Sequence, residues 1–200
     1  YRVHVIDYDA SADVVYPPKG ARQLVGDPRR DPFEGVRAAS LLDDPAFHAQ
    51  NVYAIAMRIL ARFEHALGRR VGWGFPGHQL KVAPHAFADT NAFYSRRDEG
   101  LLFGYARRPR GSPLFTCLSH DIVAHETTHA LVDGLRRRFM MPSSPDQAAF
   151  HEAMGDLVAL LSVFSLREVV RALLDLKWGK SSGGRGKGRL VRRRDITVER

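Results

Sequence analysis

Cysteine is nearly absent from this sequence of 200 residues, in which Cys117 is the only one. A single cysteine cannot form an internal disulfide, so the fold must depend on packing and not on cross-links. Long apolar runs are also missing, and their absence excludes a membrane-spanning helix. No signal peptide is visible and the sequence starts at Tyr1, which leaves both a cytoplasmic protein and a secreted, processed one open. The length suits one domain, or two lobes around a cleft.

Acidic residues are absent from one strongly basic stretch near the C-terminus. The net charge is +8, and residues 177–194 hold eight of the basic residues: Lys177, Lys180, Arg185, Lys187, Arg189, Arg192, Arg193 and Arg194. The Gly and Ser residues between them predict a flexible, solvated segment. Nucleic-acid binding is the alternative, but side chains that could stack on bases are missing beyond Trp178, so we do not expect it. The sequence does not indicate an oligomeric state.

The most informative segment is His125-Glu126-Thr127-Thr128-His129, which reads H-E-x-x-H within an apolar run. In a helix, His125 and His129 are four residues apart and point the same way, so two imidazoles can hold one zinc ion. Glu126 then lies beside the metal, where it can act as a general base on a water molecule. The alternative is a pair of histidines on an ordinary amphipathic helix.

A catalytic zinc ion usually takes three protein ligands, so a third is needed. Residues 144–161 predict a helix on which Glu152 and Asp156 share one face. Charged carboxylates on this apolar helix need partners. We expect Glu152 to bind the metal and Asp156 to accept a hydrogen bond from the far ring nitrogen of a ligating histidine. The alternatives are a salt bridge from Glu152 to the arginines of residues 136–138, and a simple surface carboxylate at Asp156.

Periodicity predicts the other elements. Apolar spacing indicates a helix from Asp44 to Leu67 that ends at Gly68. Residues 7–37 predict a loop with one short strand near Val14, and residues 107–113 a basic loop. The remaining predicted elements are strands at residues 1–6, 80–87 and 101–105 and a helix at residues 166–178.

These motifs resemble the thermolysin family of zinc metallopeptidases. Residues 121–133 resemble its active-site helix, and Glu152-Ala153-Met154-Gly155-Asp156 resembles its E-A-x-x-D helix. Asn91-Ala92-Phe93-Tyr94 resembles the segment with which the family binds substrate backbone, which implies that role for Asn91 and Ala92. The alternative for this segment is a plain turn. The resemblance covers about residues 44–165.

The sequence departs from the family at three places. No tyrosine lies between the two zinc helices, and no histidine follows His151. The family places transition-state donors at both positions. Asp121, which we expect to cap its helix, matches one ligand of the family's calcium site, but Val163 stands where another acidic ligand is expected, which argues against calcium. We therefore expect either a truncated catalytic core or a divergent member that uses another oxyanion donor, with an arginine or Tyr94 as candidates.

Together these observations predict an α+β fold: a small mixed sheet with a backing helix, packed on the active-site helix and followed by a mainly helical lobe. We expect residues 1–138 to form the α/β lobe, residues 139–178 the helical lobe and residues 179–200 a basic tail. The predicted function is zinc-dependent endopeptidase activity on peptides or proteins, with one zinc ion. The alternative is a non-hydrolytic zinc-binding module of the same fold.

Overall fold

The computed structural model describes residues 2–16, 33–106, 113–141 and 143–179. The chain divides into two units, Tyr1–Val163 and Phe164–Arg200. The division into lobes at residues 138 and 178 stays a prediction. The basic tail beyond residue 179, most of the loop at 107–113 and part of that at 7–37 lie outside the described residues.

The first unit contains a mixed sheet, as predicted. Its strand order is β1 (Val3–Val5), β4 (Leu80–Phe87), β6 (Gly100–Ala106) and β5 (Ala92–Ser95), and β7 (Leu114–Phe115) also pairs with β6. The first three strands run parallel, whereas β5 and β7 are antiparallel to β6. A separate antiparallel pair joins β2 (Tyr8–Asp9) to β3 (Val14–Val15).

Helix α2 (Pro45–Leu67) is the predicted backing helix. Asp44 caps it by accepting from the Ala46 N–H at 3.0 Å, and Gly68 ends it in the left-handed conformation, at φ 64°. Its buried apolar stripe packs on the sheet, because side chains at helical spacing share one face. A short helix, α1 (Ala38–Leu41), precedes it.

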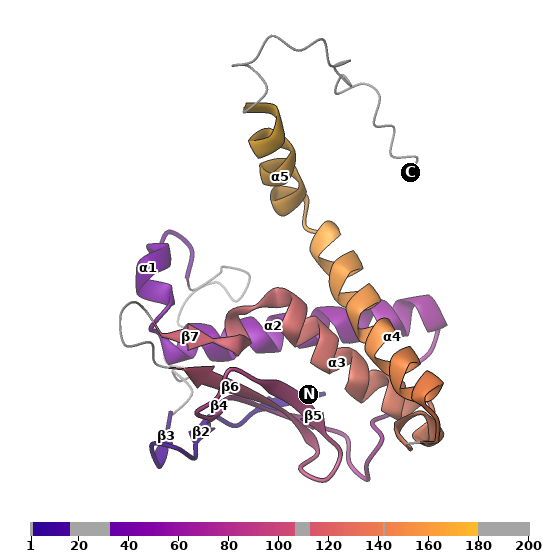
Figure 1. The fold of residues 1–200 in the computed structure, drawn as a ribbon. Helices are drawn as coiled ribbons and strands as arrows, with labels where there is room; N and C mark the ends of the chain where they lie inside the picture. Colours follow the sequence, from indigo (N-terminus) through magenta and orange to yellow (C-terminus); the bar gives the residue numbers. More distant parts are fainter. Residues whose placement is uncertain (1, 17–32, 107–112, 142, 180–200) are drawn as a thin grey trace. The chain divides into compact units, whose positions relative to one another are not determined.

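Helix α3 (His120–Leu135) lies beside α2, on the same side of the sheet (Figure 1). The 3-10 turns η2 (Thr116–Leu118) and η3 (Arg137–Met140) flank it. Asp121 is not the N-cap that the sequence predicted. Ser119 holds that position and donates its hydroxyl to the Asp121 carboxylate, which belongs to the first turn. A carboxylate there still stabilises the helix, because it faces the positive end of the helix dipole.

Helix α4 (Pro145–Phe164) begins as predicted, with the Ser144 hydroxyl accepting from the Gln147 N–H at 3.2 Å. The Gln147 side-chain amide donates to the Phe139 carbonyl and not back to Ser144, so only the Ser144 half of a capping box forms. In the second unit, α5 (Arg167–Gly179) matches the last predicted helix. Within the described ranges, no helix has the length and apolar character needed to cross a bilayer. The α+β class is confirmed at this level.

Candidate metal centre and cleft

Helix α3 positions the two histidines of the H-E-x-x-H segment. The His125 and His129 rings lie 4.6 Å apart between centroids and meet edge to face, as a spacing of four residues on a helix dictates. Burial and, to a smaller extent, the neighbouring His125 together lower the pKa of His129 to about 4. His129 is therefore neutral at pH 7, which is the form that binds a metal.

Glu152 on α4 brings its carboxylate to both imidazoles. Its Oε2 lies 3.3 Å from His125 Nε2, and its Oε1 lies 3.6 Å from His129 Nε2. Ligand atoms at about 2.0–2.1 Å from a tetrahedral zinc lie roughly 3.3–3.4 Å apart, so the two histidine-to-carboxylate distances are close to those of a shared ion. This convergence favours the ligand role over the alternative salt bridge to the arginines of residues 136–138.

Asp156 lies one helical turn after Glu152 and reaches the other nitrogen of His125. The distance from His125 Nδ1 to Asp156 Oδ1 is 2.9 Å, so the ring donates there while Nε2 faces Glu152. Between the two carboxylates, Gly155 lets α4 approach the ring. A Cβ at that position would lie 2.8 Å from His125 Nδ1. The structure thus brings together all five predicted residues of this centre: His125, Glu126, His129, Glu152 and Asp156.

His151, which belongs to none of the predicted motifs, lies in the same cluster. It is buried, its ring stacks on His129, and the two Nδ1 atoms lie 2.6 Å apart. His151 therefore contacts Nδ1 of His129, the ring nitrogen that does not face Glu152, just as Asp156 contacts Nδ1 of His125. Its Nε2 is buried without a hydrogen-bond partner. The only sequence signal was its place directly before Glu152, because neighbours on a helix differ by about 100° and both can face α3.

Glu126 faces the sheet, where its Oε2 accepts from the Tyr94 N–H of β5 at 3.0 Å. Burial raises the pKa of Glu126 to about 7, while the charge of His125 and the Tyr94 hydrogen bond oppose the rise. Since β5 is an edge strand whose other side pairs with β6, the Tyr94 N–H must point away from the sheet. By the two-residue period of a strand, the backbone of Ala92 points the same way.

Asp133, one turn after His129, faces away from the metal centre. It is fully buried and accepts from the Tyr94 hydroxyl at 2.7 Å and from Arg96 Nε at 2.8 Å. Gly74 packs directly against this carboxylate, because a Cβ there would overlap it. Tyr94 was a predicted candidate for the oxyanion donor, but its hydroxyl is held by Asp133. Arg96 is held by the same carboxylate.

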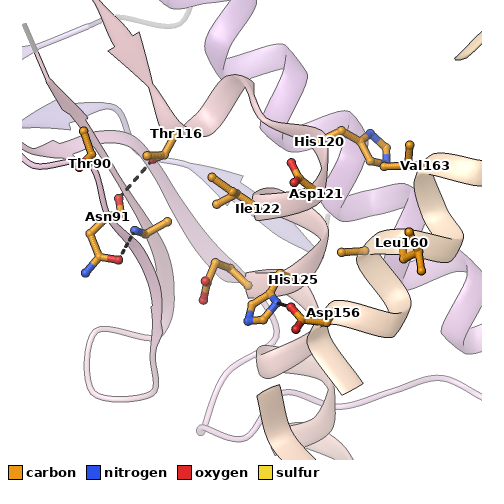
Figure 2. Close-up of a pocket in the computed structure, with 13 residues that line it drawn as sticks. Thr90, Asn91, Thr116, His120, Asp121, Ile122, His125, Asp156, Leu160 and Val163 are labelled. Atoms are coloured by element: carbon orange, nitrogen blue, oxygen red, sulfur yellow. Dashed lines mark hydrogen bonds and ion pairs between the residues drawn. The ribbon is translucent and has the colours of Figure 1, made fainter. Parts of the chain in front are cut away.

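A pocket of about 830 Å³ extends along α3 between β5 and α4. Figure 2 shows Thr90, Asn91 and Thr116 on one wall and the α4 residues Asp156, Leu160 and Val163 on the other. Ala92, His125 and Glu126 also line it. Two hydrogen bonds fix the position of Asn91. Its carbonyl accepts from the Gly104 N–H at 2.8 Å, and its side chain accepts from the Ala92 N–H at 2.9 Å. Asp121 and Val163 also line the pocket, and the absence of calcium stays a prediction.

No family model matches the sequence, and no curated protein matches it. A solved structure similar to this chain is the precursor of protealysin, a metalloproteinase from Serratia proteamaculans, with a TM-score of 0.50 and 16% sequence identity. The alignment covers 82% of this chain and 45% of that chain, so this chain spans less than half of that protein's length. At this identity the likeness shows a shared zincin-like fold and nothing about activity.

Proposed function

We propose that this chain is a zinc-dependent endopeptidase domain. The observation that carries the proposal is the cluster at the wall of the cleft: ligand atoms of His125, Glu126 and His129 lie within 4.8 Å of one another, and the Glu152 carboxylate lies 3.3 Å from His125 Nε2 and 3.6 Å from His129 Nε2. Two imidazoles, one carboxylate and a neighbouring glutamate are the usual set for metal-assisted hydrolysis.

In this proposal His125, His129 and Glu152 hold the zinc ion, and Asp156 and His151 orient the two rings. A bound zinc ion would supply Lewis acidity, making a water more acidic and the scissile carbonyl more electrophilic. Glu126 takes the proton of the attacking water and then gives it to the leaving amine. Its hydrogen bond from the Tyr94 N–H fixes one carboxylate oxygen and leaves the other for this proton transfer.

The substrate backbone would lie along β5. β5 is an edge strand whose outward N–H groups are already taken, that of Ala92 by the Asn91 side chain and that of Tyr94 by Glu126. An extended peptide would therefore pair with it by donating a hydrogen bond to the Ala92 carbonyl. Asn91 supports this edge through its contacts with Gly104 and Ala92. A peptide so placed would bring a carbonyl group near Glu126.

A second candidate function is zinc binding without hydrolysis. The observation that favours it is that both candidate donors for the oxyanion, Tyr94 and Arg96, are engaged by Asp133. A missing donor typically reduces turnover by about 10²–10³-fold.

The test combines metal analysis with peptide cleavage. The purified chain should hold a transition metal, and His129→Ala should lose the metal of this centre, whereas His65→Ala on the exposed surface of α2 should keep it. Glu126→Gln should keep the metal and the Tyr94 hydrogen bond but lose chelator-sensitive hydrolysis, with Glu168→Gln as the control. Full activity in Glu126→Gln would refute the general base. A metal-loaded wild type without hydrolysis would support the second function.

A further inference from the structure

A second group of metal-binding side chains lies away from the cleft, in the core of the first unit. It comprises His48 of α2, His85 of β4 and Cys117 of η2, with one ligand atom from each within 4.8 Å of the others. All three side chains are buried, with exposed fractions of 0%, 3% and 0%. None of these residues belongs to the proposed catalytic centre. Sequence separations of more than 30 residues hide the group from any motif search.

The two histidines form part of a hydrogen-bonded chain that ends in an acceptor at both sides. The Leu42 carbonyl lies 3.0 Å from His48 Nε2, His48 Nδ1 lies 2.7 Å from His85 Nε2, and His85 Nδ1 lies 2.7 Å from the Asp7 carboxylate. The two outer contacts each need an N–H on the imidazole, which uses the single proton of each neutral ring. The two inner nitrogens of the neutral rings then face each other with lone pairs only, so the contact needs a cation between them, either an additional proton or a metal ion.

We propose that this cation is a second zinc ion, held by His48 Nδ1, His85 Nε2 and Cys117 Sγ. A tetrahedral zinc site places two nitrogens roughly 3.3 Å apart and a nitrogen and a sulfur roughly 3.6 Å apart. From the observed 2.7 Å the two nitrogens must therefore open by about 0.6 Å on binding the ion, and Cys117 Sγ already lies within 4.8 Å of a nitrogen on each ring.

The groups around the two histidines match those of a metal site. A ligating histidine commonly donates its other N–H to a carboxylate or a backbone carbonyl. Here Asp7 accepts from His85, and the Leu42 carbonyl accepts from His48. Burial lowers the pKa of His48, which favours the neutral ring that binds a metal.

A pocket of about 420 Å³ reaches both histidines and provides an entry path and room for a fourth ligand. Asp9 and Asp43 line it, so its local charge favours a cation. Burial raises the pKa of the Cys117 thiol to about 12, so the thiolate would form only with the metal in place. The ion would join α2, β4 and the segment before α3, in a chain that has no disulfide to do so.

Cobalt(II) substitution of the whole chain tests the proposal. Because Cys117 is the only cysteine, a thiolate-to-cobalt charge-transfer band in the near ultraviolet can come from this site alone. We expect that band in the wild type and in His129→Ala, with two equivalents of cobalt or zinc in the wild type and one in His129→Ala. His48→Ala should lose the band and keep one equivalent, and His4→Ala, on the exposed side of β1, should keep both.

A folded wild-type chain that shows no thiolate band in excess cobalt would overturn the proposal. The cation between the two imidazoles would then be a proton shared by the two rings. The wild-type band decides the question even if His48→Ala fails to fold. The thiolate band does not depend on the metal bound by His129, so His129→Ala should keep the band even when it loses hydrolysis. The proposal of a second zinc site and the proposed peptidase function can therefore be refuted separately.

Discussion

Adding one methyl group at Gly155 should weaken metal binding at the proposed centre without removing any ligand. In Gly155→Ala, the new Cβ would lie 2.8 Å from both Nδ1 and Cε1 of His125. Ordinary contacts between such atoms are about 3.5 Å, so the ring or helix α4 must move by roughly 0.7 Å. Metal-ligand bonds tolerate about 0.2 Å.

Either movement separates His125 from the carboxylates of Glu152 and Asp156. We expect zinc affinity to fall at least as far as the roughly 10–100-fold typical for loss of an orienting group. The fold should survive, because alanine is favoured over glycine within a helix by about 1 kcal/mol. We therefore expect Gly155→Ala to bind zinc more weakly while helix α4 stays stable.

Competition with a chromophoric chelator measures the affinity, and circular dichroism with thermal melting checks the fold. Gly72→Ala is the matched control, because a Cβ there meets nothing within 4 Å, and it should bind zinc like the wild type. A folded Gly155→Ala chain with unchanged zinc affinity would show that α4 does not pack on His125 as described here.

The remaining predictions concern the residues that support the centre. Asp156→Asn should weaken zinc binding about 10–100-fold, whereas Asp133→Asn should reduce thermal stability and spare zinc; the reverse pattern in metal titrations would exchange their roles. His151→Ala should also weaken zinc binding about 10–100-fold, and unchanged affinity would make it a packing residue. Tyr94→Phe removes one buried hydrogen bond to Asp133, so we expect a loss of about 1–2 kcal/mol, or roughly 2–8 °C in Tm, with zinc affinity unchanged. An unaltered melting curve would contradict the importance of that bond.

Several features of the cleft depend on backbone pairing and could not be inferred from side-chain types. Asn91 and Ala92 were expected to bind substrate, yet only the sheet order shows that Ala92 belongs to an edge strand whose backbone faces the cleft. Similarly, Tyr94 looked like a free donor, but its hydroxyl binds Asp133, which lies 39 residues later. Which hydroxyl meets which carboxylate is decided by packing between elements.

The sequence by itself determined the elements whose signals are local. Capping residues and apolar periodicity predicted α2 from Asp44 to Gly68, and the spacing of His125, Glu126 and His129 predicted one shared helix face. These features depend on the geometry of a single helix, so a short window contains all the information. Tertiary structure alone decided that His151 supports His129 and that His48, His85 and Cys117 meet in the core. No spacing rule could predict the second group from the sequence, because its residues lie far apart along the chain and only the packing of α2, β4 and η2 brings them together.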